Sequence, residues 1–159
     1  MPSAVLVQVA EAIKSAIKDH DFGVTFDELE RNWADFNVEI EEIGKLRCDV
    51  VGVVHEACEF DSRGSLNYVC PVDIVIRKRF GQADQTDCGR LDVKEIDRLA
   101  LLVEQINEFF CEEYNKRLPG FDDATWRSVD IRACASREHL QKRMFLGVVR
   151  VTYDVHKAL

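Results

Sequence analysis

The stretch EHLQKRMFLGVVRVTYDV, residues 138–155, decides how this chain folds. Taken at every second position, one side of it is apolar and comprises Phe145, Val149, Val151, Tyr153 and Val155. The other side comprises Leu146, Val148, Arg150, Thr152 and Asp154, of which two are charged. This period predicts a β-strand with one buried face. For the mixed second face two interpretations stay open, a strand edge kept for another subunit and a plain solvated face.

Two runs upstream have the same alternation. Residues 46–54, LRCDVVGVV, predict a Val-rich strand in which Gly52 marks a bulge or a close approach. Residues 69–80, VCPVDIVIRKRF, alternate from Val72 onward, and Pro71 indicates a strand start or an edge position. Because the segment between the runs is polar and turn-prone, we expect a long β-hairpin around residues 55–70.

Two amphipathic helices are predicted, one in each half of the chain. Apolar residues three and four positions apart run from Val5 to Ile17, and again from Ile96 to Tyr114. Asp92 is the expected N-cap of the second helix, with Glu95 three residues later able to reach back. Pro119 and Gly120 end this helical segment.

The order of elements predicts the fold class. Residues 24–36 stay open, because Thr25 and Glu28 have capping-box spacing whereas Val24 and Phe26 alternate as in a strand. The order is therefore helix, two or three strands, helix, and two strands, the last two near residues 126–135 and at the C-terminus. This order predicts a single α+β domain over residues 1–159, with a mostly antiparallel sheet packed by two main helices.

Composition excludes some classes of protein. The chain has 159 residues and a formal net charge of −8, and its longest cationic run is RKR at 77–79. Such a chain is a poor candidate for binding nucleic-acid phosphates, because that affinity depends on clustered cations. Its first twenty residues read as an amphipathic helix, and we expect no signal peptide and no contact with a membrane. Its six cysteines include no C-x-x-C pair, so we expect reduced thiols and a cytoplasmic protein.

Motifs for chemistry are absent from the sequence. Neither G-x-G-x-x-G, G-x-x-x-x-G-K-[ST] nor G-x-S-x-G occurs. The densest group of metal-binding residue types is His55, Glu56, Cys58, Glu59 and Asp61, but zinc ligands converge from several elements and these follow one another. We therefore expect no catalytic residue, no metal site and no cofactor.

Several stretches together resemble one protein family. They are FDELERNWADFNVEIEEIGKLRCDVVGVV, SRG, YVCPVDIVIRKRF, LDVKEIDRLALLVEQINEFF, WRSVDIRA and EHLQKRMFLGVVRVTYDV, which together cover nearly the whole chain. The set is similar to the tail-terminator and tail-completion (neck) proteins of long-tailed bacteriophages and prophages.

The resemblance implies a structural virion protein, assembled in the cytoplasm of the host bacterium. Tail terminators form a ring, typically hexameric, on the last ring of tail-tube subunits, where they stop elongation and meet the head-side connector or stopper protein. DNA only passes through the lumen, and an acidic wall would keep it from sticking. A closed ring needs a heterologous interface between copies.

The hairpin is the expected contact with a neighbouring subunit or the tail tube. Tyr and Arg are enriched at protein interfaces, and by resemblance Arg63 is the matching family position. A solvated loop is the alternative. The candidate interface residues are Asp61, Arg63, Leu66, Asn67, Tyr68 and, on the C-terminal strand, Arg150.

Two alternatives to a terminator remain. One is another neck or head–tail connector protein with the same architecture. The other, from a different class, is a small α+β ligand-binding or enzymatic domain.

Overall fold

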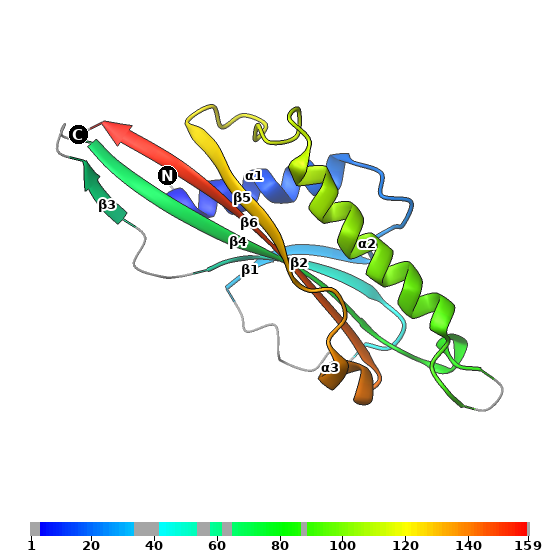
Figure 1. Cartoon of the computed structure of the whole chain (residues 1–159). Coiled ribbons are helices and arrows are strands. Elements are labelled where there is room, and N and C mark those ends of the chain that lie inside the picture. Colours follow the sequence, from blue (N-terminus) through cyan, green and yellow to red (C-terminus); the bar gives the residue numbers. More distant parts are fainter. Residues whose placement is uncertain (1–3, 34–41, 54–57, 62–64, 87–88, 159) are drawn as a thin grey trace.

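A computed structural model describes residues 4–33, 42–53, 58–61, 65–86 and 89–158 of the chain. Four strands follow the first helix without interruption, a segregation expected for an α+β domain (Figure 1). In chain order they are α1 (Val5–Asp19), β1 (Glu28–Asn32), β2 (Leu46–Gly52), β3 (Cys58–Asp61), β4 (Ser65–Arg79), the 3-10 turn η1 (Gln82–Asp84), α2 (Val93–Cys111), β5 (Ala124–Ala133), α3 (Arg137–Gln141) and β6 (Met144–Ala158).

The strands form one mixed sheet. Its order is β1-β2-β4-β6-β5, and β3 pairs with the first residues of β4. Only the β1–β2 pair is parallel among the described strands. The α+β class, the antiparallel character of the sheet and the two main helices are thus confirmed.

The C-terminal strand lies inside the sheet. β6 pairs with β4 over fifteen positions, from Ser65↔Ala158 to Arg79↔Met144, and with β5 on its other side. Both interpretations of its second face are therefore wrong. It is neither an open edge nor plainly solvated, because Leu146 and Val148 are buried there and Arg150 forms an ion pair.

Both main helices cover the same face of the sheet. The apolar stripes of α1 and α2 pack on the side chains of β2, β4 and β6 that point to this face. The fully buried centre of this core includes Val9, Ile13, Ile74, Ile76, Leu99, Ile106, Phe110, Phe145, Val149 and Tyr153. A smaller apolar cluster of Val51, Val75, Leu146 and Val148 lies on the opposite face.

Helix α2 begins as predicted and ends earlier. Asp92 Oδ1 accepts a hydrogen bond from the amide of Lys94 at 3.0 Å, as an N-cap does. Glu95 does not reach back to the cap, since its carboxylate accepts from Lys78 and Arg98. The helix ends at Cys111, because Glu112 takes an extended conformation. Tyr114 is therefore not on the buried stripe, and 90% of it is exposed.

Residues 28–32 settle the ambiguity left by the sequence. They form strand β1, which runs parallel to β2 from Glu28↔Arg47 to Asn32↔Val51. Asp27 holds the start of this pair, because its amide donates to Leu46 O at 2.9 Å and its carboxylate accepts from Leu46 N at 2.7 Å. Residues 24–27 and 33 of the ambiguous stretch belong to neither a helix nor a strand, and residues 34–36 lie outside the described part.

Gly52 marks a close approach, one of the two roles expected of it. A Cβ atom built on Gly52 would lie 3.0 Å from Cγ of Leu6, so α1 crosses β2 directly over this residue. A larger residue here would push α1 away from the sheet.

Pro71 does not start a strand. The strand that contains it, β4, is not an edge strand over its whole length. Pro71 lies within β4, and its carbonyl accepts from Val53 N at 2.9 Å. A residue in an antiparallel strand directs its N–H and C=O to the same side. The missing N–H of Pro71 therefore falls where the neighbour of β4 changes from β2 to β3, and the ladder loses little.

The expected hairpin is present with one more strand in it. β2 and β4 are antiparallel, as predicted, from Leu46↔Lys78 to Gly52↔Val72. Their connection contains β3, which pairs with β4 from Cys58↔Tyr68 to Asp61↔Ser65. Residues 58–61 and 65–68 thus continue the sheet, and the alternative of a solvated loop is wrong for them.

No helix in the described part of the chain is long and apolar enough to cross a membrane.

The core assignment leads to a stability prediction. Replacing Ile106 or Phe110 by Ala should lower the free energy of unfolding by roughly 2–5 kcal/mol, because each empties a fully buried site. Urea unfolding followed by circular dichroism measures the change. Leu101→Ala on the same helix is the control, since Leu101 is 51% exposed and its truncation should cost much less. Equal curves for all three variants would contradict this core.

Candidate functional site

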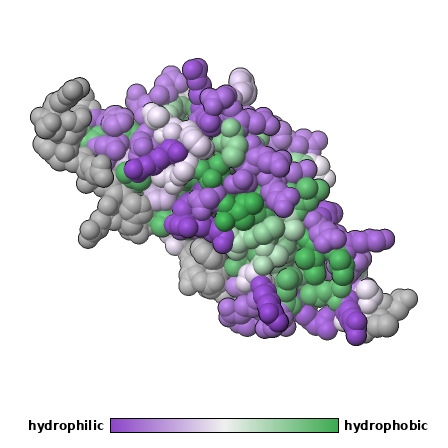
Figure 2. All heavy atoms as spheres, in the orientation of Figure 1, coloured by the Kyte–Doolittle hydropathy of each residue, from purple (hydrophilic) through white to green (hydrophobic). Residues whose placement is uncertain are grey.

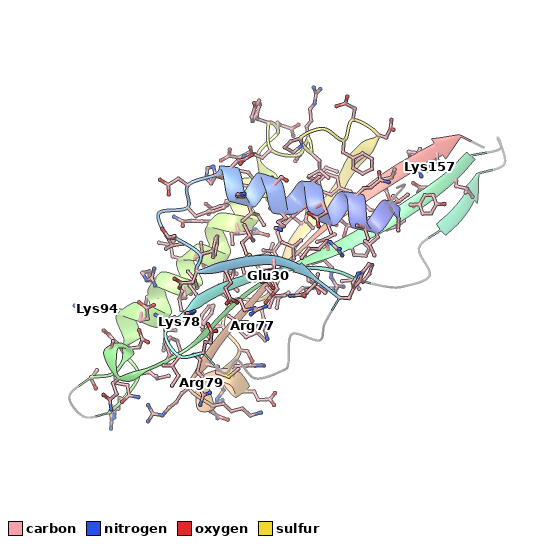
Figure 3. All side chains as sticks on the ribbon, turned by 180° about the vertical axis from the view of Figure 1, so that it is seen from behind. Glu30, Arg77, Lys78, Arg79, Lys94 and Lys157 are labelled. Atoms are coloured by element: carbon pink, nitrogen blue, oxygen red, sulfur yellow. The ribbon has the colours of Figure 1, made fainter. Side chains whose placement is uncertain are left out.

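Three strands project beyond the helix-covered part of the sheet. β3, the first residues of β4 and the last residues of β6 form this three-stranded arm (Figure 1). Its pairs run Leu66↔Lys157, Asn67↔His156 and Tyr68↔Val155. Lys157 is exposed near the tip, where Figure 3 labels it at the end of the molecule opposite Lys94.

The arm brings together three of the six predicted interface residues. Leu66, Asn67 and Tyr68 are all half-buried, and Tyr68 packs against the main core. The Oδ1 atom of Asn67 is buried and has no hydrogen-bond partner among the described residues. Asp61 joins them through its backbone pairing with Ser65. Arg63 lies outside the described residues, as does the side chain of Asp61.

Arg150 belongs to a different place. It lies seven residues along β6 from the partner of Leu66, about 23 Å away at the rise of an extended strand. Its guanidinium donates to both carboxylate oxygens of Asp73, at 2.8 and 3.1 Å. Asp73 is only 3% exposed. Arg150 therefore forms an ion pair within the sheet face, apart from the arm, and its role at an interface stays a prediction.

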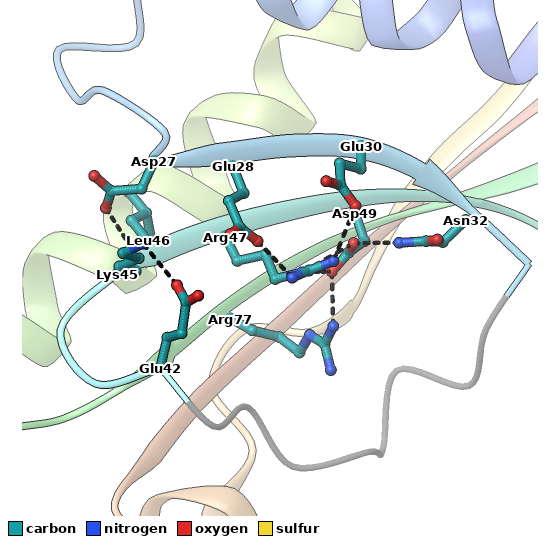
Figure 4. Close-up of polar contacts among 10 residues, drawn as sticks. All are labelled: Asp27, Glu28, Glu30, Asn32, Glu42, Lys45, Leu46, Arg47, Asp49 and Arg77. Atoms are coloured by element: carbon teal, nitrogen blue, oxygen red, sulfur yellow. Dashed lines mark hydrogen bonds and ion pairs between the residues drawn. The ribbon is translucent and has the colours of Figure 1, made fainter.

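The same face holds a second, larger network of charges around Asp49. Asp49 is 1% exposed and accepts from Arg47, from Arg77 at 2.8 Å and from Asn32 at 2.8 Å (Figure 4). Arg47 also donates to Glu28 and Glu30 of the neighbouring strand. Burial alone would raise the pKa of Asp49, but the hydrogen bonds from Arg47, Arg77 and Asn32 together lower it.

The sequence carries a signal for this network that the predictions missed. Charged residues at Arg47, Asp49, Asp73 and Arg77 interrupt two otherwise apolar strands, with each pair separated by an even number of positions. In a strand such residues share one face. Pairing the strands then places opposite charges beside each other, and the pattern predicts ion pairs within the sheet.

A pocket lies where the two main helices end. This helix-end pocket has a volume of about 840 Å³ and is formed by Ala16, Asp19 and His20, by Phe109, and by residues 113–115, 117–120 and 122. The rings of His20, Phe22 and Phe109 contact one another, with centroids 4.5–5.5 Å apart. Its volume lies within the range of small-molecule sites. Sequence reasoning missed it, because its walls come from separate segments.

Hydrophobic residues also reach the surface along α2. Figure 2 shows them gathered at the centre and lower right of the face seen in Figure 1. The most exposed of them on α2 are Val93, at 67%, and Leu101, at 51%. Trp33, next to β1, is 53% exposed, with the guanidinium of Arg31 at 5.8 Å from its ring centroid.

The described residues offer no metal-binding group of three or more His, Cys, Asp and Glu side chains. Of the cluster considered in the sequence, His55 and Glu56 lie outside the described part, and the side chains of residues 58–61 are not described either. Cys48, Cys70, Cys111 and Cys134 carry free thiols. Burial raises the pKa of Cys70 to about 11, which makes this thiol a poor nucleophile.

Comparison with known proteins identifies no family. No model of a protein family matches the chain, and no curated protein matches it.

The Asp49 network leads to a second stability prediction. Asp49→Ala should lower the free energy of unfolding by about 3–5 kcal/mol, because it leaves two guanidiniums without their shared buried carboxylate. Glu30→Ala is the matched control, since Glu30 bonds the same Arg47 from a side chain that is 55% exposed. Its cost should stay below about 1 kcal/mol. Denaturant unfolding measures both, and equal costs would contradict the assigned role of Asp49.

The lowered pKa of Asp49 predicts how this stability depends on pH. A carboxyl whose folded pKa lies below its unfolded value stabilises the protein fully above that unfolded value, about 3.9 for Asp. The stabilisation is lost as the pH falls from there through the folded pKa. Stability of the parent should therefore fall more steeply below pH ~4 than that of Asp49→Asn. Unfolding midpoints between about pH 6 and 3 test this, and parallel curves would contradict it.

Proposed function

We propose that this chain is a structural protein of a bacteriophage virion. It forms a ring at the head-proximal end of the tail tube, stops tail elongation and joins the tail to the head-side connector. Its partners are further copies of itself, the tail-tube protein and the connector, and its function needs no cofactor and no catalytic residue. The proposal starts from the resemblance of six sequence stretches to tail-terminator and neck proteins.

The three-stranded arm is the observation that supports this proposal best. A strand pair of fifteen residues carries the arm beyond the helices, and of the described arm residues Tyr68 and Val155 pack with the main core. It presents the half-buried side chains of Leu66 and Asn67 and the exposed side chain of Lys157. The arm is thus suited to contact a neighbouring subunit or the tube.

A ligand-binding domain is the second candidate function, and the helix-end pocket favours it. This pocket has the volume of a small-molecule site and an aromatic wall. Light scattering on the purified protein discriminates between the two, because a ligand-binding domain of this size is commonly a monomer or dimer. Rings in electron micrographs would favour the virion protein.

The arm leads to a functional prediction. Replacing residues 60–66 by Asn-Gly keeps the Cys58↔Tyr68 and Glu59↔Asn67 pairs around a tight turn and removes the tip. The variant should fold, because the core lies elsewhere, but should fail to end tails. The assay is electron microscopy of tails made in cells that carry the cognate phage genome without this gene, complemented with each variant.

The controls for this assay are the parent chain and Lys94→Ala. Lys94 is exposed at the opposite end of the molecule and its loss should leave tail length normal (Figure 3). Tails of uncontrolled length without the gene, and again with the shortened arm, are the expected result. Normal tails with the shortened arm would show that the arm is not the contact. Normal tails without any copy of the gene would refute the terminator function itself.

A further inference from the structure

The helix-end pocket lies in an acidic region of the surface. Its two flanking segments, residues 18–22 and 111–123, contain twice as many carboxylates as cations. The carboxylates are Asp19, Asp21, Glu112, Glu113, Asp122 and Asp123, and the cations are Lys18, Lys116 and Arg117. Lys116 already forms an ion pair with Glu113 at 2.8 Å. Asp19 and Asp122 therefore remain as exposed carboxylates in the wall of the pocket, with Arg117 and His20 beside them.

The backbone adds negative potential at the same place. Both α1 and α2 end at this pocket, and the last turn of a helix carries partial negative charge on its carbonyl groups. The last turn of α2 contains no basic residue, and that of α1 contains only Lys18. The pocket therefore favours a cation.

The floor of the pocket is apolar. Ala16, Phe109 and Leu118 line it and are at most 9% exposed, whereas Tyr114 stands at its rim and is 90% exposed. Arg and Lys side chains combine an aliphatic stem with a cationic head, and the guanidinium of Arg also stacks on aromatic rings. An apolar floor, an exposed ring and acidic walls together suit such a side chain.

The chain presents cations of this kind on its other side. Arg137, Lys142 and Arg143, in and after α3, are all exposed, and Glu138, the one carboxylate among residues 137–143, forms an ion pair with Lys142 at 4.0 Å. Arg143 donates to Gly89 O at 3.2 Å, which brings the exposed Arg90 close to them. We call these four cations the basic end. Figure 1 places α3 at the bottom of the view and the ends of α1 and α2 at the top, with the sheet between them.

We propose that the helix-end pocket of one copy receives the basic end of the next copy. The two patches lie at opposite ends of α2, whose nineteen residues span about 28 Å, and they cannot meet within one chain. A contact between two different patches is heterologous, and its repetition closes a ring if the rotation between copies allows. This inference rests on the proposed ring, and it assigns the subunit contact to these patches, which leaves the arm for the tail tube.

Charge reversal tests the contact. Asp19→Lys with Asp122→Lys reverses the pocket, and Arg137→Glu with Lys142→Glu reverses the basic end; all four side chains are exposed. Sedimentation velocity of the purified chain at low salt should show self-association of the parent. Each reversal should weaken it about tenfold or more, because like charges then face each other. A chain with all four changes should associate again, as should a mixture of the two reversed chains.

Glu104→Lys is the matched control, because it reverses an exposed charge on α2 outside both patches and should change nothing. High salt should weaken association of the parent, since exposed charges are screened. The proposed contact is overturned if either reversed chain associates as strongly as the parent, or if association does not recover in the fourfold variant. The ring itself would still be tested by the assay of tail length. A parent chain that stays monomeric up to about 1 mM at low salt would also overturn the proposed contact. A parent that binds a polyamine in this pocket without associating would identify a small cation as the occupant instead.

Discussion

The hydrogen-bond ladder between β4 and β6 is the constraint on which the rest of the structure depends. Fifteen residues of each strand pair in one register, so a single alignment decides which face every side chain of both strands occupies. In this register Ile74 and Val149 lie under the helices, while Asp73 and Arg150 meet on the other face. A slip of β6 by one residue would move Arg150 into the helix-covered core, away from Asp73, and would move Val149 out of that core. Only the native register gives the helices α1 and α2 a continuous apolar face to cover.

The charged residues of the second face reinforce this register. A carboxylate as buried as that of Asp49 or Asp73 loses its hydration, and a guanidinium on the adjacent strand replaces it. Buried ion pairs add little net stability compared with apolar side chains of similar volume, because desolvation offsets much of the attraction. These ion pairs act mainly against other registers of the strands, because a wrong register would leave a buried charge unpaired. The face thus selects one pairing of the strands, whereas the helix-covered face contributes most of the burial.

Features of the fold that depend on residues close together in the sequence could be predicted, and features that depend on distant segments could not. The alternation of β4 and β6 and the stripe from Ile96 to Phe110 depend on residues close in sequence, and these elements are confirmed. The position of β6 inside the sheet, the pairing of Arg150 with Asp73 and the place of Pro71 depend on neighbouring strands far away in sequence. The helix-end pocket depends on two segments, far apart in the sequence, that meet at the ends of α1 and α2. The periodicity of a sequence shows which side chains share one face of a helix or strand. It does not show which other element covers that face.

The edges of the sheet limit how copies of the chain can associate. β1 has five residues, of which three are charged, and β5 has two register shifts and exposed Arg127, Asp130 and Arg132. Short, charged and bulged edges resist pairing with a strand of another molecule. Association by extension of the sheet at β1 or β5 is therefore disfavoured, and contacts at these two edges are made by side chains. For a chain of net charge −8, random encounters are repulsive, so an attractive contact needs local concentrations of opposite charge. Four exposed cations lie at one end of the molecule, away from the acidic ends of α1 and α2, and this segregation provides the local concentrations of opposite charge that such a contact needs.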